Sequence, residues 1–296
     1  MIAVVVVTFL ACWLLNSLVA VPACVPRIAD AYVLRFALPV LIVSKMSRVG
    51  FDSSVAVPVA AAWCSMAACA LAVVVLTRMN NWSRSTMGAL LLVAVLGNTS
   101  FLGLGVVSGL LGESHMQAAI AYDQPGTFLA LALWGSFIAG RYGSGEPGWR
   151  PIVRRLLRFA PFVALLVSIP LRNVDLGADT YRVLDAIGRT VPPMAMGAVG
   201  LRFVLRAPRR VLGPAVTGLV VKMIAAPAAL FVVAATAASV HDTGWAASIM
   251  QSAAPPMVTA GVVAVDAGLD EDLVTFTVGV GTLLAFVTLP VLSLLL

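Results

Sequence analysis

Charged side chains are scarce in this chain of 296 residues. They make up 11% of it, whereas hydrophobic residues make up 61%. Soluble domains usually carry about 25% charged residues. The mean hydropathy is +1.02. This balance excludes a soluble fold and predicts an all-α protein that crosses the lipid bilayer several times.

Histidine and paired cysteine patterns are also lacking. The two histidines, His115 and His241, lie far apart, and the four cysteines show no C-x-x-C spacing. Neither a zinc site nor a disulfide framework is indicated. The chain has no H-E-x-x-H and no G-x-S-x-G motif, which are signatures of known enzyme classes. We therefore expect no enzyme, no metal and no cofactor.

The few charges divide the chain into apolar runs long enough to be membrane spans. A spanning helix needs about 20 apolar residues. The pattern predicts ten transmembrane helices: Ile2–Ala20, Ile28–Ser44, Val55–Leu76, Met87–Leu111, Ala118–Gly140, Ile152–Leu171, Tyr181–Leu205, Val211–Val240, Trp245–Ala267 and Leu273–Leu296. Val211–Val240 is longer than one span requires, so we expect part of it to be loop.

A polar stretch rich in Gly and Ser, residues 141–150, lies in the middle of the chain. Such a composition is typical of a linker. It separates residues 1–140 from residues 151–296, each with five predicted spans. Because five is odd, the second half enters the membrane with the opposite orientation. This is the arrangement of an inverted repeat.

The basic residues lie unequally on the two predicted sides of the membrane, twelve against five. Lys and Arg are enriched in cytoplasmic loops. The side with twelve, which includes residues 141–150, is therefore expected to be cytoplasmic, with both termini extracytoplasmic in an inner or plasma membrane. This asymmetry accounts for the net charge of +6 without a nucleic-acid partner.

The fourth span of each half contains residues that interrupt a helix. One holds Gly97-Asn98-Thr99-Ser100 and the other Gln251-Ser-Ala-Ala-Pro255-Pro256. Proline removes a backbone donor, and glycine is a poor helix former. Interrupted helices at matching positions of two repeats indicate a transporter binding site. The alternative is that these residues only permit kinks and close helix packing.

These two stretches resemble the auxin efflux carrier family, which includes the plant PIN carriers and bacterial malonate-type permeases. Gly97–Gly103 is similar to the first crossover motif of that family, and the chain from Gln251 to Pro290 is similar to its C-terminal region. Tyr122-Asp-Gln and Lys222 also resemble family positions. The resemblance covers the whole chain in span order.

The resemblance implies a fold like that of the sodium–proton antiporter NhaA, with spans 4 and 9 as broken crossover helices. It implies a scaffold of spans 1, 2, 6 and 7, a transport part of spans 3–5 and 8–10, and a homodimer through the scaffold. Two departures stand out. Gly105 occupies a position where the family usually has proline, and the long cytoplasmic loop of plant PIN carriers is absent.

Six residues of the two interrupted stretches are the candidate substrate-binding residues. The amide of Asn98 can donate to a carboxylate or cap a helix. Thr99 and Ser100 can offer hydroxyl donors or bond back to their own helix. Gln251 can point into the same cavity or be structural, whereas Pro255 and Pro256 are expected to shape the chain.

Ionisable residues within spans are functional candidates by default. Asp123 is a candidate to carry a coupled proton, and Lys222 to attract an anion; a structural ion pair is the alternative for each. Asp30 and Arg35 are expected to form a buried or snorkelling pair. The coupling ion is expected to be H⁺ or Na⁺.

We therefore expect a secondary transporter of a small organic anion, such as an auxin-like compound or a dicarboxylate. It would work by alternating access around a site near the middle of the membrane. The alternative is a membrane receptor or sensor that binds a carboxylate without moving it.

Overall fold

The part of the chain that the structure describes is mostly helical. The structure, a computed structural model, describes residues 2–19, 21–48, 55–143, 157–158, 160–202, 208–237 and 239–296. Within these ranges the regular elements are all helices, without a β-strand. The first five residues of the predicted span Ile152–Leu171, the end of Tyr181–Leu205 and most of the predicted linker lie outside them.

The chain forms two compact units, each built from two separate stretches. Unit 1 comprises Met1–Phe51 and Val153–Phe203, and unit 2 comprises Asp52–Ile152 and Val204–Leu296. Each unit therefore takes residues from both halves of the sequence.

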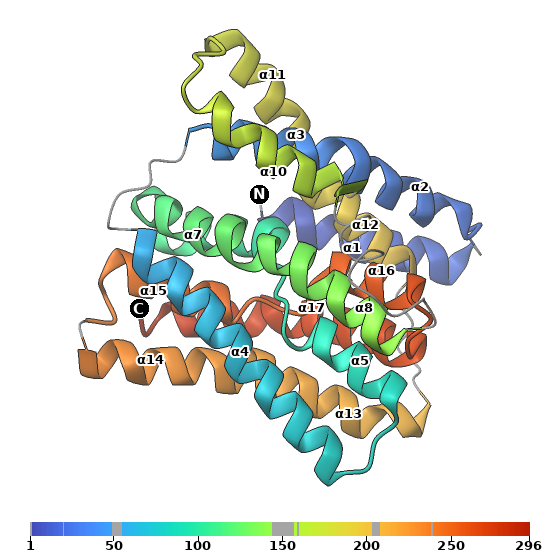
Figure 1. Cartoon of the computed structure of the whole chain (residues 1–296). Helices are drawn as coiled ribbons and strands as arrows, with labels where there is room; N and C mark the ends of the chain where they lie inside the picture. Colours follow the sequence, from blue (N-terminus) through green and yellow to red (C-terminus); the bar gives the residue numbers. More distant parts are fainter. Residues whose placement is uncertain are drawn as a thin grey trace. The chain divides into compact units, whose positions relative to one another are not determined.

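Unit 1 contains helices from both ends of its two stretches (Figure 1). They are α1 (Ile2–Leu18), α2 (Cys24–Tyr32), the π-helical turn η1 (Val33–Ala37), α3 (Leu38–Met46), α10 (Ala160–Leu171), α11 (Ala178–Gly188) and α12 (Val191–Arg202). Helices α2, η1 and α3 follow one another without a gap. Helix α1 packs against α12, and α3 packs against α10 and α11.

Two predictions for unit 1 need correction. The predicted single span Tyr181–Leu205 is two helices, because α11 ends at Gly188 and α12 starts at Val191. Two prolines follow Val191, and proline is tolerated in the first turn of a helix but not in its interior. Asp30 does not pair with Arg35: its carboxylate lies 2.6 Å from Nη2 of Arg202, and the side chain of Arg35 is exposed.

Unit 2 contains the remaining helices. They are α4 (Ala56–Met79), α5 (Arg84–Val93), η3 (Thr99–Gly103), α6 (Leu104–Val106), η4 (Val107–Leu111), η5 (Glu113–His115), α7 (Met116–Tyr122), η6 (Asp123–Phe128), η7 (Leu131–Gly135), α8 (Ser136–Tyr142), α13 (Arg209–Val220), η8 (Val221–Ala225), α14 (Ala226–Ala237), α15 (Thr243–Ser252), α16 (Val258–Asp266) and α17 (Glu271–Ser293). Helix α15 packs against α4, α7 and α14, and α16 packs against α5 and α17.

The stretch expected to be partly loop, Val211–Val240, is helical through Ala237. Helices α13, η8 and α14 follow one another without a gap, and Figure 1 shows them as one long rod. Pro214 lies inside α13, in its second turn, where it removes one backbone hydrogen-bond donor without ending the helix.

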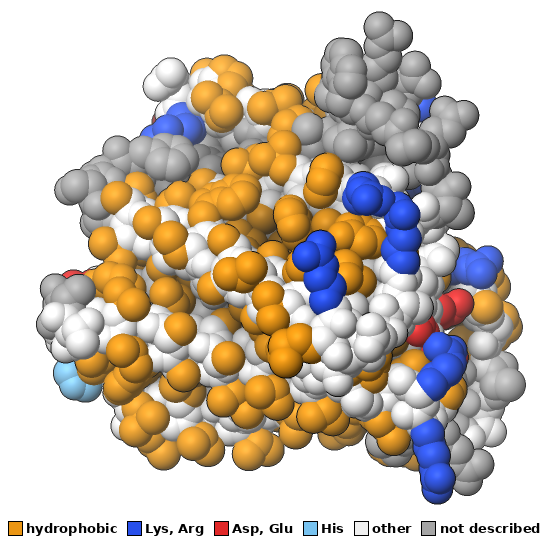
Figure 2. Space-filling view, turned by 60° about the horizontal axis from the view of Figure 1, so that its bottom comes forward, with side chains coloured by type: hydrophobic (Ala, Val, Ile, Leu, Met, Phe, Trp, Pro, Cys, Tyr) orange, Lys and Arg blue, Asp and Glu red, His pale blue; other side chains and the backbone are white. Residues whose placement is uncertain are grey.

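Among the described residues, three helices are each long and apolar enough to cross a bilayer: Ala56–Met79, Arg209–Thr236 and Glu271–Ser293. Their outward side chains remain apolar, since Leu71 is 66% exposed, Ile224 60% and Val287 64%. Figure 2 shows a face over which hydrophobic side chains predominate, with most of the visible basic side chains on the right of the view. Apolar surface on this scale fits contact with lipid rather than water.

Candidate functional site

The first interruption lies between α5 and η3. Helix α5 starts after Ser83, whose hydroxyl accepts a hydrogen bond from the Thr86 N–H, and ends at Val93. Residues 94–98 are not helical, and helix resumes at Thr99 and continues to Leu111. Asn98, with φ −77° and ψ 60°, is the last non-helical residue.

The second interruption lies between α15 and α16. Asp242 starts α15 by accepting hydrogen bonds from the N–H groups of Gly244 and Trp245, and the helix ends at Ser252. Residues 253–257 are not helical, and α16 starts at Val258. Pro255 and Pro256 lie within this segment, where their missing N–H groups break no helical hydrogen bond.

The two non-helical segments pair with each other. The N–H of Asn98 donates to the carbonyl of Pro255 at 2.7 Å, and the N–H of Met257 donates to the carbonyl of Leu96 at 2.9 Å. Gly97 and Pro256 form an antiparallel bridge between these bonds. In hydrocarbon a main-chain polar group needs a protein partner. Each interruption thus supplies partners for groups that the other leaves open.

The side chain of Asn98 is buried at this bridge without a partner. It is 0% exposed, and neither its Nδ2 nor its Oδ1 makes a hydrogen bond in the structure. An unpaired buried polar group costs about 1–3 kcal/mol, so this amide is available for a ligand.

Gln251 reaches the same region from the end of α15. Its Nε2 donates to the carbonyl of Ala119 at 3.1 Å, and its Oε1 is buried without a partner. A Cβ added to Gly103 would lie 2.0 Å from that Oε1. Glycine at this position is therefore what allows Gln251 to lie against the helix that follows Asn98.

Thr99 and Ser100 contact Asp123, which the sequence singled out as a candidate proton carrier and not as a substrate-binding residue. The hydroxyl of Thr99 donates to Oδ1 of Asp123 at 2.5 Å, and the hydroxyl of Ser100 lies 2.7 and 2.8 Å from its two carboxyl oxygens. Nε2 of Gln124 donates to Oδ2 at 2.6 Å. Asp123 is 0% exposed. These donors hold the Asp123 carboxyl group against the start of the second half of the broken helix.

Lys222 lies close to the bridge, beside Gly97. It is 2% exposed, and its Nζ donates to the carbonyl of Ser252, the last residue of α15, at 2.7 Å. A Cβ on Gly97 would be 2.9 Å from its Cε and from its Nζ. Of the two predicted roles, the pairing with an acid is not found: the ion pairs of the described residues do not include Lys222.

Sequence reasoning missed the π-helical turns that carry these residues. Thr99 and Ser100 lie in η3, Asp123 starts η6, and Lys222 lies in η8. π-Helical turns are rare and occur frequently at functional sites. It assigned no role to Gln124, although Tyr122-Asp-Gln was part of the family resemblance, and it missed the carbonyls of Ala119 and Ser252, which have no sequence signal.

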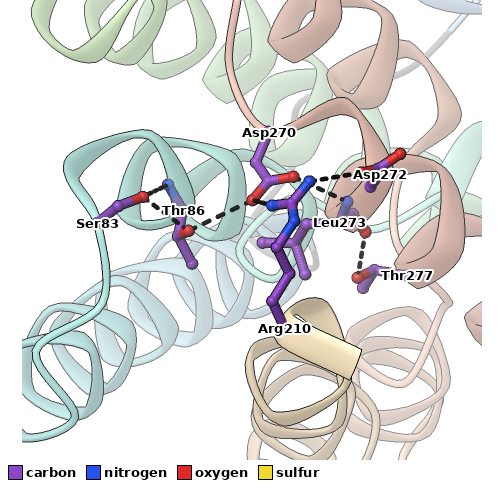
Figure 3. Close-up of polar contacts among 7 residues, drawn as sticks. All are labelled: Ser83, Thr86, Arg210, Asp270, Asp272, Leu273 and Thr277. Carbon is purple, nitrogen blue, oxygen red and sulfur yellow. Dashed lines mark hydrogen bonds and ion pairs between the residues drawn. The ribbon is translucent and has the colours of Figure 1, made fainter. Parts of the chain in front are cut away.

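A second polar cluster lies where α5, α13 and α17 begin (Figure 3). Arg210 donates to Asp270 at 2.9 Å and to Asp272 at 2.5 Å. Asp270 also accepts hydrogen bonds from the hydroxyl of Thr86 at 3.5 Å and from the N–H of Leu273. The bond from Leu273 caps the start of α17. We call these residues the Arg210 cluster. It ties three helix starts together at one end of unit 2.

Comparison with known proteins also points to a membrane transporter. The family described as membrane transport protein matches residues 1–147 and 150–293. An uncharacterized transporter of Methanothermobacter thermautotrophicus is 27% identical over 274 residues, covering 89% of this chain and 87% of its own. An uncharacterized transporter of Methanocaldococcus jannaschii is 30% identical over 120 residues, covering 39% of this chain and 38% of its own.

The matched residues include both interruptions and nearly all of both units. This confirms the family resemblance, the membrane location and the expectation of a transporter rather than an enzyme. The chain belongs to the membrane transport protein family, which is the auxin efflux carrier family.

Proposed function

We propose that the protein is a secondary transporter of a small organic anion, which binds at the paired interruptions. The observation that carries this proposal is the Asn98 amide, buried and unpaired beside a bridge between two broken helices. Such a group stabilises the protein only when a ligand completes its hydrogen bonds. Because Asn98 is 0% exposed, the substrate reaches it only when unit 2 opens.

Three features favour an anion. The first N–H groups of a helix lack helical partners and carry partial positive charge, and helices start next to the bridge at Thr99 and Val258. The amide of Asn98 can donate to a carboxylate. The ammonium of Lys222 lies beside Gly97, so the local field favours negative charge. The unpaired Oε1 of Gln251 can accept a hydrogen bond from a substrate hydroxyl or N–H.

The two units support a division into scaffold and transport part. In this proposal unit 1 is the scaffold and unit 2 is the transport part. The two units together would contain ten spans in an NhaA-like inverted repeat. The Arg210 cluster fits this arrangement: α5 comes from the first half of the sequence and α13 and α17 from the second, yet all three begin at one end of unit 2. Transport would proceed by alternating access, and the homodimer would form through unit 1.

The orientation follows from the basic residues. Arg84 donates to the main-chain carbonyl of Arg141, so basic residues at the start of α5 and at the end of α8 lie together. Arg78 and Arg210 belong to the same predicted side of the membrane. We propose that this end of unit 2 is cytoplasmic and that both termini are extracytoplasmic.

Asp123 is the proposed carrier of a coupled proton, because it contacts the helix that follows Asn98.

The test is a thermal-shift screen of the purified protein against small carboxylates, followed by flux in proteoliposomes. A ligand that binds only the folded form raises stability by about 2.7 kcal/mol at one hundred times its Kd. We expect one class of carboxylate to raise Tm and to be transported. A ligand that raises Tm without flux would support the receptor alternative; no shift and no flux with any anion would overturn the proposal.

Asn98→Ala tests the site itself. The variant should keep the ligand-free Tm of the parent protein or exceed it, because it removes an unpaired buried amide. Its ligand-induced shift should disappear, and transport should fall about 10- to 100-fold, the effect of losing one hydrogen bond to a charged ligand.

Thr77→Val is the matched control. Like Asn98→Ala, it removes a buried polar group of unit 2 that has no partner, in this case a hydroxyl. This hydroxyl lies near the end of α4 and not in either interruption. Its ligand shift should equal that of the parent protein. Unchanged transport in Asn98→Ala would contradict the site assignment.

A further inference from the structure

The ammonium of Lys222 is a cation buried without an anionic partner. It is 2% exposed, and among the described residues no carboxylate lies within ion-pair distance of it. An unpaired buried charge is strongly unfavourable in protein. An ammonium therefore persists at this place only where another group compensates its charge.

The compensating group is the end of a broken helix. Lys222 Nζ donates to the carbonyl of Ser252 at 2.7 Å, and Ser252 is the last residue of α15. The carbonyls at a helix C-terminus carry partial negative charge equivalent to about half an electron. In secondary transporters, such C-terminal ends and unwound carbonyls are where a coupling Na⁺ is coordinated.

The position of the ammonium relative to the bridge is equally specific. Gly97 lies in the first interruption, and a Cβ there would come within 2.9 Å of both Cε and Nζ of Lys222. The same Nζ bonds Ser252, at the edge of the second interruption. The lysine head thus lies between the two segments, and the absence of a side chain at Gly97 provides its room.

We propose that the Lys222 ammonium is a resident cation, which takes the place that a coupling Na⁺ would fill at the paired interruptions. The protein then needs no sodium at this place, neither for stability nor for transport. The part of this inference that concerns transport rests on the proposed function, whereas the part that concerns stability does not.

The test compares Tm in sodium chloride and in choline chloride at equal ionic strength. Choline is too large for the room that a lysine ammonium occupies. The parent protein should have the same Tm in both salts. Lys222→Ala should have a lower Tm in choline chloride and regain part of the loss in sodium chloride, because sodium can then reach the carbonyl of Ser252.

Lys45→Ala is the matched control, since Lys45 and Lys222 are the two lysines of the chain and Lys45 belongs to unit 1. It should behave like the parent protein in both salts. If Lys222→Ala does not fold, Lys222→Gln takes its place, because it keeps an N–H donor for Ser252 but no charge. It should show the same dependence on sodium with a smaller loss of Tm.

Two results would overturn the proposal. One is a sodium-specific rise in Tm of the parent protein, which would mean that sodium has a site of its own. The other is an equal loss of Tm in both salts for Lys222→Ala and Lys222→Gln, which would make Lys222 a structural residue only.

Flux in proteoliposomes separates this inference from the proposed function. Equal rates with and without a sodium gradient support the resident cation, and rates that require sodium overturn it. Absence of flux under both conditions counts against the proposed function, and the comparison of Tm values then still decides the role of Lys222.

Discussion

Several polar side chains of unit 1 bond to one another, whereas several buried ones in the described part of unit 2 have no partner. In unit 1, Asp30 pairs with Arg202 at 2.6 Å, Asp185 with Arg48 at 2.6 Å, and Tyr32 with Thr190 at 2.9 Å. The buried side-chain atoms that lack a partner among the described residues belong to Thr77, Asn98, Gln124, Gln251 and Thr288, and all five residues lie in unit 2.

This difference agrees with the roles proposed for the two units. An unpaired buried polar atom costs about 1–3 kcal/mol, and three of the five residues lie at or next to the paired interruptions. A part that binds and releases a polar substrate needs such atoms, because fully satisfied groups would have no bonds to offer. The bonded side chains of unit 1 suit a part that keeps one arrangement.

The largest effect is expected from Met257→Pro, which attacks the bridge of unit 2. The φ of Met257 is −72°, which proline adopts readily, but the variant lacks the N–H that donates to Leu96. Met257→Ala loses the same buried side chain and serves as the reference. Relative to it, Met257→Pro should have a free energy of unfolding that is about 1–3 kcal/mol lower, and it should lose transport. Equal stability of the two variants in chemical denaturation would show that the bridge contributes nothing.

The next effect is expected from Gly103→Ala. The new Cβ would lie 2.0 Å from Oε1 of Gln251, so Gln251 must turn away and give up its bond to Ala119. Overpacking of this kind costs about 1–3 kcal/mol, and ligand binding should weaken as well.

Gly213→Ala is the control for Gly103→Ala, because the nearest atom to its Cβ is 3.9 Å away. It should leave Tm unchanged, or raise the free energy of unfolding by about 0.5–1 kcal/mol through its better helix propensity. Similar losses in the two variants would show that the contact with Gln251 is unimportant.

A smaller and different effect is expected from Arg202→Gln in unit 1. The variant leaves the carboxylate of Asp30, whose side chain is 13% exposed, without this ion pair. The expected loss is about 1 kcal/mol, seen as a drop of Tm, with the ligand-induced shift unchanged. A lost ligand shift would break the division between a bonded unit 1 and a binding unit 2.

The smallest effect is expected from Arg210→Ala. Its side chain is 59% exposed in both ion pairs, and exposed pairs contribute no more than about 1 kcal/mol. High salt should reduce the difference from the parent protein, because exposed charges are screened. A large loss that persists in high salt would show that the Arg210 cluster holds the helix starts by more than charge.

Helices were predictable from the sequence because apolar runs bounded by charge leave few alternatives in a membrane. Both interruptions were predictable as well, since Gly97 and the Pro255-Pro256 pair oppose helix for local reasons. The break at Gly188 was missed because the stretch has the length of a single span, although Gly188 followed by Pro192 and Pro193 is a local signal for a helix end. The continuous helix through Val221 was missed for the reverse reason: length alone suggested a loop.

The site was predictable in its members but not in its connections. Asn98, Thr99, Ser100, Asp123 and Lys222 were all singled out from the sequence. That Thr99 and Ser100 bond Asp123, and that Lys222 bonds a carbonyl, depends on packing between residues far apart in the chain. π-Helical turns have no composition that marks them, so their concentration around the site could not be predicted.

The bridge between the interruptions consists of main-chain atoms: Asn98 N with Pro255 O, and Met257 N with Leu96 O. Main-chain donors are the same for every residue except proline. If Asn98 binds substrate as proposed, a change of side chain at position 98 would alter what the protein recognises while the frame that presents it persists. Such a frame would allow substrate preference to diverge among related carriers by single substitutions, without rebuilding the fold around them.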